Sequence, residues 1–228
     1  MLACGCGRIA FDPLGDGGGG GGDALVGDGG TVGLVTGTSS AGTGLVDLRA
    51  LGVGPDGSVA ILVRMPTSLD LGNGTVFTNT VRSDLVIVTF DPSGAVRWGR
   101  QFVDTFDPGV GILIDGQQAL VINGNGDVIM AAEFASSVDF GTGLRTSAGA
   151  DDIAVISISS ANAVRWVKTF GTTTSETVSG IAVAADNSLW VTGGFANSVD
   201  FGTGALTSAG SGDVFLVHFA VFHQIQRF

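Results

Sequence analysis

The sequence contains no tyrosine, few charged residues and only two cysteines, both within its first six residues. Charged residues make up 14% of the chain and hydrophobic residues 44%. A disordered chain has the reverse balance, so the composition predicts a folded protein. No segment reaches the roughly 18 consecutive apolar residues that a membrane-spanning helix needs, so the sequence predicts no such helix.

Basic residues are scarce as well, with 10 lysines and arginines against 21 acidic residues and a net charge of −11. A field of this sign repels phosphate backbones, which argues against nucleic acid as a partner. No polybasic cluster is present to hold an anionic lipid surface. We therefore expect membrane contact only through a lipid anchor.

The first eight residues, Met-Leu-Ala-Cys-Gly-Cys-Gly-Arg, resemble the end of a bacterial lipoprotein signal, in which small residues precede a lipidated cysteine. The resemblance implies lipidation at Cys4 or Cys6 and an extracellular or outer-membrane location. A signal also needs an apolar segment of about 7–15 residues, for which Met1 leaves no room. We expect either a start upstream of Met1 or an ordinary N-terminus whose thiols are incidental or form a chance metal-binding pair.

Glycine is abundant, with 39 residues, of which six stand in a row at positions 17–22. Such a run has maximal backbone freedom, so we predict a flexible tether within residues 1–30 and a folded domain over residues 31–228. A phosphate-binding glycine loop is the competing interpretation, but no strand precedes the run, no helix follows it and no Gly-Lys-Ser/Thr ends it. Elsewhere, glycine with many Val, Thr and Phe residues indicates short strands joined by tight turns.

The body of the chain is repetitive. Residues 138–143, Val-Asp-Phe-Gly-Thr-Gly, recur identically at 199–204, with a looser copy at 69–74. In each copy a second aspartate opens an apolar run, and these residues are Asp84, Asp152 and Asp213. The Val-Arg-Trp tripeptide that ends at Trp98 returns 68 residues later, ending at Trp166, the same distance that separates Asp84 from Asp152. Two independent markers with one period predict three tandem copies of one unit.

Each copy contains four short strand candidates bounded by turn residues. In the second copy they are residues 96–103, 118–122, 127–134 and 152–158. The Asn-Gly-Asn-Gly sequence at 123–126 predicts a hairpin between two of them, and 55–58 and 186–188 are the equivalent turns. Four-stranded antiparallel units in tandem are typical of propeller blades, which are apolar on both faces and must stack. The sequence predicts an all-β fold, a partial β-propeller of about three four-stranded antiparallel blades.

Four segments follow one another in the repeats: the Trp strand, Val-Thr-Gly-Gly-Phe at 191–195, the "VDFG" segment and Ser-Ala-Gly before an aspartate. Their order resembles the bacterial repeat family described as seven-bladed β-propeller repeats. The resemblance covers about residues 31–219. It implies a cell-surface or secreted location and supplies no catalytic residue.

Two features depart from that family. Three copies cannot close a ring, which needs at least four blades, and Arg227 stands at the offset of Trp98 and Trp166. The chain is then cut short, or the array stays open, or two chains complete one ring. An open array exposes apolar faces at both ends, which favours self-association.

The most conspicuous carboxylates recur as pairs in the three copies. Their shared repeat positions are Asp70 with Asp84, Asp139 with Asp152, and Asp200 with Asp213. They suit either Ca²⁺ ligation or the capping of turns through backbone N–H groups. Because a functional group is expected in one blade only, we interpret them as structural and predict no metal site. Residues 123–127 faintly resemble a calcium loop, but Asp127 alone is charged among the first donors, so a hairpin is favoured.

Three further groups of residues are candidates for a functional site. Asp151 and Asp152 as a glycosidase pair are poorly placed, because adjacent strand residues point to opposite faces. Trp98 and Trp166 share one repeat position, which favours blade packing. Trp190 stands where the other copies have alanine and isoleucine, so it is the first candidate for ligand contact.

These observations predict a non-enzymatic interaction module, at the cell surface or secreted, that binds protein or glycan and uses no cofactor. A truncated repeat array with a structural role only is the alternative. A propeller glycoside hydrolase is the third interpretation, for which no blade-specific cluster of ionisable groups is found.

Overall fold

Strands are the only regular elements in the part of the chain that the structure describes. This computed structural model describes residues 47–65, 68–71, 73–78, 84–102, 112–113 and 120–220. The strands form repeated antiparallel sheets, which confirms the predicted all-β class. Within these ranges no helix has the length and apolarity that a membrane crossing requires. Cys4, Cys6, the glycine run at 17–22 and Arg227 lie outside the described residues.

The first sheet is a four-stranded antiparallel blade, blade 1, with the strand order β1-β2-β5-β6. Its strands are β1 (Asp47–Val53), β2 (Val59–Met65), β5 (Asp84–Phe90) and β6 (Val96–Phe102). The central β5 is buried along its whole length, as its continuous run of branched and aromatic side chains predicts. In β6, Arg97, Arg100 and Gln101 stand among apolar residues, as suits the outer edge of a sheet.

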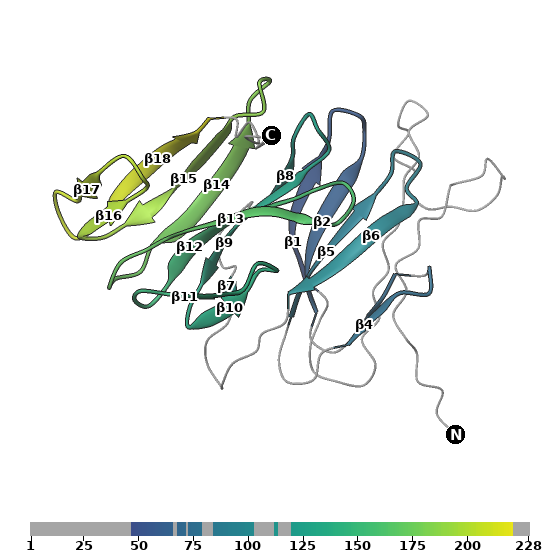
Figure 1. Ribbon diagram of the computed structural model, residues 1–228, viewed down its shortest axis with the longest axis horizontal. Coiled ribbons are helices and arrows are strands. Elements are labelled where there is room, and N and C mark those ends of the chain that lie inside the picture. Colours follow the sequence, from purple (N-terminus) through teal and green to yellow (C-terminus); the bar gives the residue numbers. More distant parts are fainter. Residues whose placement is uncertain are drawn as a thin grey trace, which may run out of the picture.

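Two further blades repeat this order (Figure 1). Blade 2 contains β7 (Ile112–Leu113), β8 (Leu120–Ile122), β9 (Val128–Phe134), β12 (Asp152–Ile158) and β13 (Val164–Phe170). Both β7 and β8 pair with β9, at opposite ends, and together take the place of β1. The described strands of blade 3 are β14 (Thr177–Val183), β15 (Leu189–Phe195) and β18 (Asp213–Phe219).

The predicted phase of the repeat was wrong. We expected the tryptophan strand to open a copy, but it closes one, because β6 pairs with β5 and β13 pairs with β12. A period gives the spacing of strands and leaves open which of them begins the unit. The feature that indicates the correct phase is the short turn after β5, in which the amide of Asp91 donates to the carbonyl of Ala95 at 2.9 Å. Strands joined by so short a turn are sheet neighbours.

The predicted hairpin turns are confirmed. Gly126 ends the turn between β8 and β9 with a φ of 76°, and Gly57 and Asn187 occupy the same left-handed position in the other blades with φ of 83° and 66°. Glycine and asparagine accept this conformation at low cost, which is why they stand there.

A second hairpin in each blade was missed. The Asp-Phe-Gly segment was expected to fill a gap between strands, but its flanks pair as three-residue strands too short to show a periodicity. These strands are β3 (Ser68–Asp70) and β4 (Val76–Thr78), β10 (Ser137–Asp139) and β11 (Leu144–Thr146), and β16 (Ser198–Asp200) and β17 (Ala205–Thr207).

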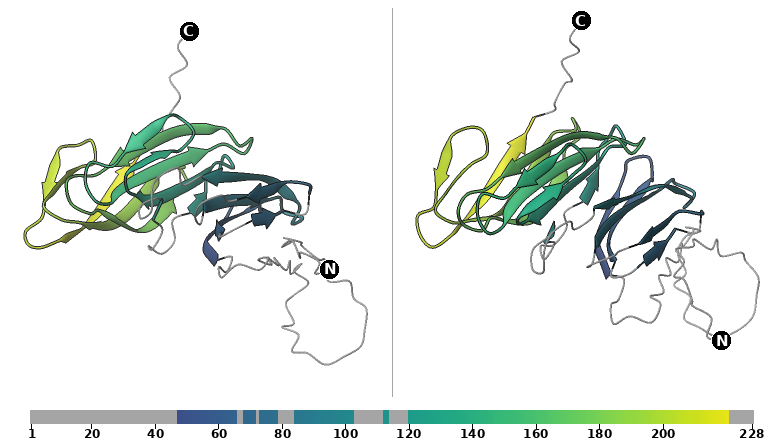
Figure 2. Two further views of the ribbon diagram at one scale, coloured as in Figure 1. Left: turned by 90° about the horizontal axis from the view of Figure 1, so that it is seen from below. Right: turned by 60° about the horizontal axis from the view of Figure 1, so that its bottom comes forward.

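The blades pack face to face, in the order of the chain (Figure 2). We call the forward face of a blade the one that meets the next blade, and the rear face the opposite one. In blade 1 the forward face carries Ala60, Leu62, Leu85 and Ile87. It forms one buried cluster with the rear face of blade 2, which carries Val128, Met130, Ala154 and Ile156. Because side chains alternate along a strand, each blade can bury both faces at once.

The forward face of blade 2 meets the rear face of blade 3 in the same way. The two faces contribute Ile129, Ala131, Ile153 and Val155, and Leu189, Val191, Phe195 and Phe215. The phenylalanine of each Asp-Phe-Gly segment fills the seam between blades. Phe140 packs edge-on against Phe134 of its own blade, with ring centroids 5.4 Å apart, and lies 6.4 Å from Phe102 of blade 1.

Replacing Phe140 with alanine should lower the free energy of unfolding by about 3–5 kcal/mol, because its fully buried ring joins two blades. Urea denaturation followed by circular dichroism measures the change. The control is Leu144→Ala on the exposed strand β11, which should change the free energy by less than about 0.5 kcal/mol. Equal effects of the two substitutions would contradict this role for Phe140.

Candidate functional site

The forward face of blade 3 is exposed. Val214, Leu216 and Trp190 have exposed fractions of 79%, 64% and 40%. The same repeat positions in blades 1 and 2 are at most 4% exposed, and they are Leu85, Ile153, Ile87, Val155, Ala60 and Ile129. The face is therefore apolar in every blade but covered only in the first two.

Trp190, the first sequence candidate for ligand contact, lies on this open face. Its indole stacks on the imidazole of His218, with ring centroids 4.4 Å apart and an angle of 26° between the planes. The two residues are cross-strand partners on β15 and β18. The structure places Trp190 on this exposed sheet face.

The opposite end of the array differs from the expectation. The sequence predicted apolar faces exposed at both ends, but Val86, Val88 and Phe90 on the rear face of blade 1 are fully buried. Leu69 and Leu71, at the end of the small hairpin strand β3, belong to the same cluster. The prediction of two exposed ends was therefore wrong for blade 1, because the repeat period carries no information on what packs over a terminal face.

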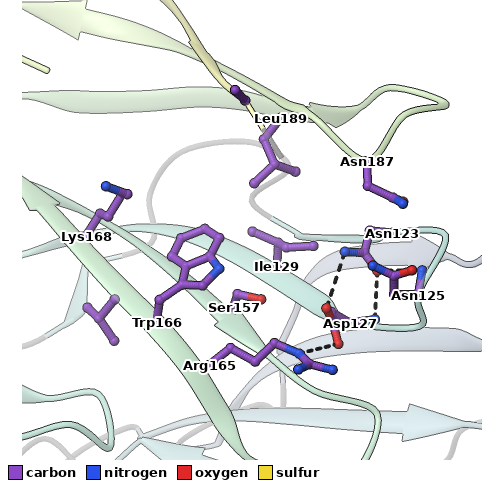
Figure 3. A pocket seen from close by; sticks show the side chains of 12 residues that line it. Asn123, Asn125, Asp127, Ile129, Ser157, Arg165, Trp166, Lys168, Asn187 and Leu189 are labelled. Atoms are coloured by element: carbon purple, nitrogen blue, oxygen red, sulfur yellow. Dashed lines mark hydrogen bonds and ion pairs between the residues drawn. The ribbon is translucent and has the colours of Figure 1, made fainter. Parts of the chain in front are cut away.

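A cavity of about 510 Å³ lies at the junction of blades 2 and 3 (Figure 3). Trp166, Arg165 and Lys168 of β13 line one side of it. The turn before β9 supplies Asn123, Asn125 and Asp127, and the equivalent turn of blade 3 supplies Asn187. The volume falls within the range of about 300–1,000 Å³ that is typical of small-molecule sites.

A β-bulge brings Arg165 and Trp166 to the same pocket. Adjacent strand residues normally point to opposite faces, but the pairing of β12 and β13 shifts between Ser157 and Ile158. Arg165 is the extra residue at this shift, since Ser157 pairs with Trp166 and Ile158 with Val164. Bulges of this kind redirect a side chain and are frequent next to functional sites.

Arg165 is held by an ion pair. Its Nε donates to Oδ1 of Asp127 at 2.8 Å, and the Asp127 side chain is only 8% exposed. Asn123 Oδ1 accepts from the amides of Asn125 and Asp127, each at 2.9 Å, which braces the turn that carries the carboxylate. Nε, and neither Nη group, makes this ion pair.

Asn187 ties the two turns together. Its Oδ1 accepts from the amide of Gly124 at 2.6 Å, across the junction between blades 2 and 3. The left-handed backbone at Asn187, with a φ of 66°, aims the side chain at the neighbouring turn. The amide nitrogen of the same side chain can then donate to a molecule in the cavity.

The equivalent junction of blades 1 and 2 is closed, with a cavity of only about 10 Å³. There the turn between β12 and β13 packs on β6, and Trp98 Nε1 donates to the carbonyl of Ser160 at 2.9 Å. Arg100 Nε donates to Oδ1 of Asn162 at 2.8 Å in the same contact. Trp98 and Trp166 both pack against an inter-blade cluster, as their shared repeat position predicts, and Trp166 also lines the larger cavity.

The recurrent aspartates lie at turns. Oδ1 of Asp139 accepts from the amides of Gly141 and Gly143 at 2.7 and 3.0 Å. Asp200 repeats both bonds with Gly202 and Gly204 at the same distances. Asp70, at the end of β3, occupies the corresponding place in blade 1.

The second aspartate of each pair begins the third long strand of its blade. Asp152 and Asp213 each accept, through Oδ2, from an alanine amide four residues earlier, at 2.8 and 2.6 Å. Asp84 accepts from Nε2 of Gln101 at 2.5 Å. None of these carboxylates lines the cavity.

Burial raises the pKa of Asp152 above its ordinary value, and the nearby carboxylates of Glu176 and Asp151 raise it further. The hydrogen bond from the amide of Ala148 acts in the opposite direction. Asp151 itself accepts from the hydroxyl of Ser175 at 3.1 Å. Asp152 is thus a carboxylate whose charged form is disfavoured by the fold.

From the sequence we predicted no functional role for Arg165 or Asn187, and the only functional role we considered for Asp127 was that of a calcium ligand. A usable signal existed, because Asp127 stands where the other blades have Ser58 and Ser188 and so occurs in one blade only. The bulge that turns Arg165 toward it leaves no such trace. No three His, Cys, Asp or Glu side chains come together as a metal site in the described part of the chain.

No protein-family model matches the chain, and no curated protein is similar to it. The fold itself defines the class, an all-β protein of tandem β-propeller-like blades with an open final face.

Replacing Asp152 with asparagine should change how stability depends on pH. A carboxyl whose folded-state pKa is raised favours the folded state below the ordinary value of 3.8, and this stability is lost as the pH rises through the folded-state pKa. Because asparagine does not ionise and can still accept from Ala148, the variant should gain stability relative to the native chain as the pH rises above 3.8. Urea denaturation from pH 3 to 7 measures this, with the exposed counterpart Asp213→Asn as control. A difference independent of pH would refute the explanation.

Proposed function

We propose that this chain is a non-enzymatic interaction module that binds protein through the forward face of blade 3. The exposure of Val214 and Leu216, at repeat positions that neighbouring blades bury elsewhere, is the observation that carries the proposal. Contiguous apolar surface of this kind marks interaction sites on folded proteins.

The backbone of β14 suits the close approach of another sheet. In blade 1, a Cβ added to Gly52 would lie 3.1 Å from the carbonyl oxygen of Leu120, so blade 2 comes nearly into backbone contact there. Ala182 holds the equivalent register position in blade 3. Two residues earlier, a Cβ added to Gly180 would meet only Thr192, at 3.6 Å. Small residues on this strand leave room for a second sheet.

A second copy of the chain is the partner that fits this face best. The forward face of blade 3 carries no carboxylate on β15 or β18. The net charge of −11 makes two copies of the chain repel each other at other surfaces. Two such faces can pack about a twofold axis as in a sandwich of two sheets. A ring completed head to tail would need the rear face of blade 1, which is already buried.

The location belongs to the same proposal. The lipoprotein-like start at Cys4 and Cys6 and the resemblance to bacterial surface propeller repeats support display at the cell surface or secretion. Under this proposal the blades act as a binding scaffold and perform no chemistry of their own.

Sedimentation velocity of the chain should reveal a dimer at micromolar concentrations. Lysine at Val214 or Leu216 should raise the dissociation constant at least about tenfold, because each places an unpaired charge in an apolar interface. Leu144→Lys is the matched control, since Leu144 is 68% exposed on the hairpin strand β11 and should not affect association. A native chain that stays monomeric at high concentration would overturn self-association through this face.

A further inference from the structure

We infer that the cavity between blades 2 and 3 binds a carboxylate-bearing sugar, such as a uronic acid residue of an acidic glycan. This site goes beyond the proposed protein interface and is lined by different residues. The lining combines an indole ring, two cationic side chains and side-chain amide groups, all from the turns and the edge strand at one junction.

The guanidinium of Arg165 recognises the carboxylate. Its bond from Nε to Asp127 orients the planar group, and both Nη groups remain to donate in the forked geometry that matches a carboxylate. Asp127 is almost fully buried and neutralised by this pair, so it does not repel the anion. Lys168 adds a second positive charge to the lining, in a chain whose net charge is −11.

The indole of Trp166 provides a flat apolar surface beside the guanidinium. A pyranose ring presents C–H groups on its faces and hydroxyls around its edge, so it can stack on an indole while its hydroxyls bond to polar neighbours. Asn187 and Asn125 supply amide groups at the opposite rim (Figure 3). This arrangement fits a ring with one carboxylate better than it fits an extended apolar ligand.

Blade 1 provides an internal comparison. Arg97 is at the same bulge position as Arg165, but it lies 3.7 Å from the exposed Asp56, and the adjoining cavity is closed. The two junctions share the Arg-Trp sequence, so the open cavity and the buried partner Asp127 distinguish the proposed site.

Isothermal titration with glucuronic acid oligosaccharides tests the inference, with glucose oligosaccharides of equal length as the neutral comparison. The uronide should bind at least about tenfold more tightly than the neutral sugar. Arg165→Gln should reduce uronide affinity at least about tenfold, whereas Arg97→Gln should leave it unchanged. Arg165→Lys should have an intermediate effect, because it keeps the charge but loses the forked donors.

Because Arg165→Gln leaves Asp127 unpaired, the double variant Arg165→Gln, Asp127→Asn keeps the test valid if the single variant unfolds. Val214→Lys should not alter binding, which separates this site from the dimer interface. Three results would each overturn the inference: no uronide binding at millimolar concentration, equal affinity for the neutral sugar, or preference for the free carboxylate of a short peptide.

Discussion

Face-to-face packing of apolar sheets is the constraint on which the rest of this structure depends. Each blade has two apolar faces because side chains alternate along its strands, and at each junction between blades a neighbouring sheet covers one of them. Ile87 and Val155 are buried by the blade that follows each of them, and Leu216, at the same repeat position, is exposed. This exposed face is the surface that the proposed self-association uses.

The same packing produces the cavity. Apolar faces fill the interior of each junction, so polar groups gather where turns and edge strands meet at its rim. At the first junction the β12–β13 turn fills this rim, and at the second the described residues leave a cavity between Trp166 and Asn187. The bulge at Arg165 then adds a second cation beside Lys168, on a surface that Arg165 would not reach from a regular strand.

Much of the fold was predictable because its signals are local. The strands β8, β9 and β12 and the turn at Asn123–Asp127 follow from residue type and period. The phase of the repeat was misjudged because a period does not indicate which strand begins the unit. The hairpins at Asp139 and Asp200 were missed because their strands are too short to alternate detectably. In the candidate site, Trp166 was recognised as a repeat residue, but its contact with the cavity was not.

The sequence by itself determined the all-β class, the number of repeats and the apolar character of every blade face, since these depend on composition and on spacing along the chain. The tertiary structure alone decided which faces are covered, which tryptophan lines the larger cavity and which arginine reaches Asp127. Those outcomes depend on contacts between residues tens of positions apart and on a one-residue shift in strand pairing. Identical residues at the same repeat position therefore have different roles, depending on which residues pack beside them.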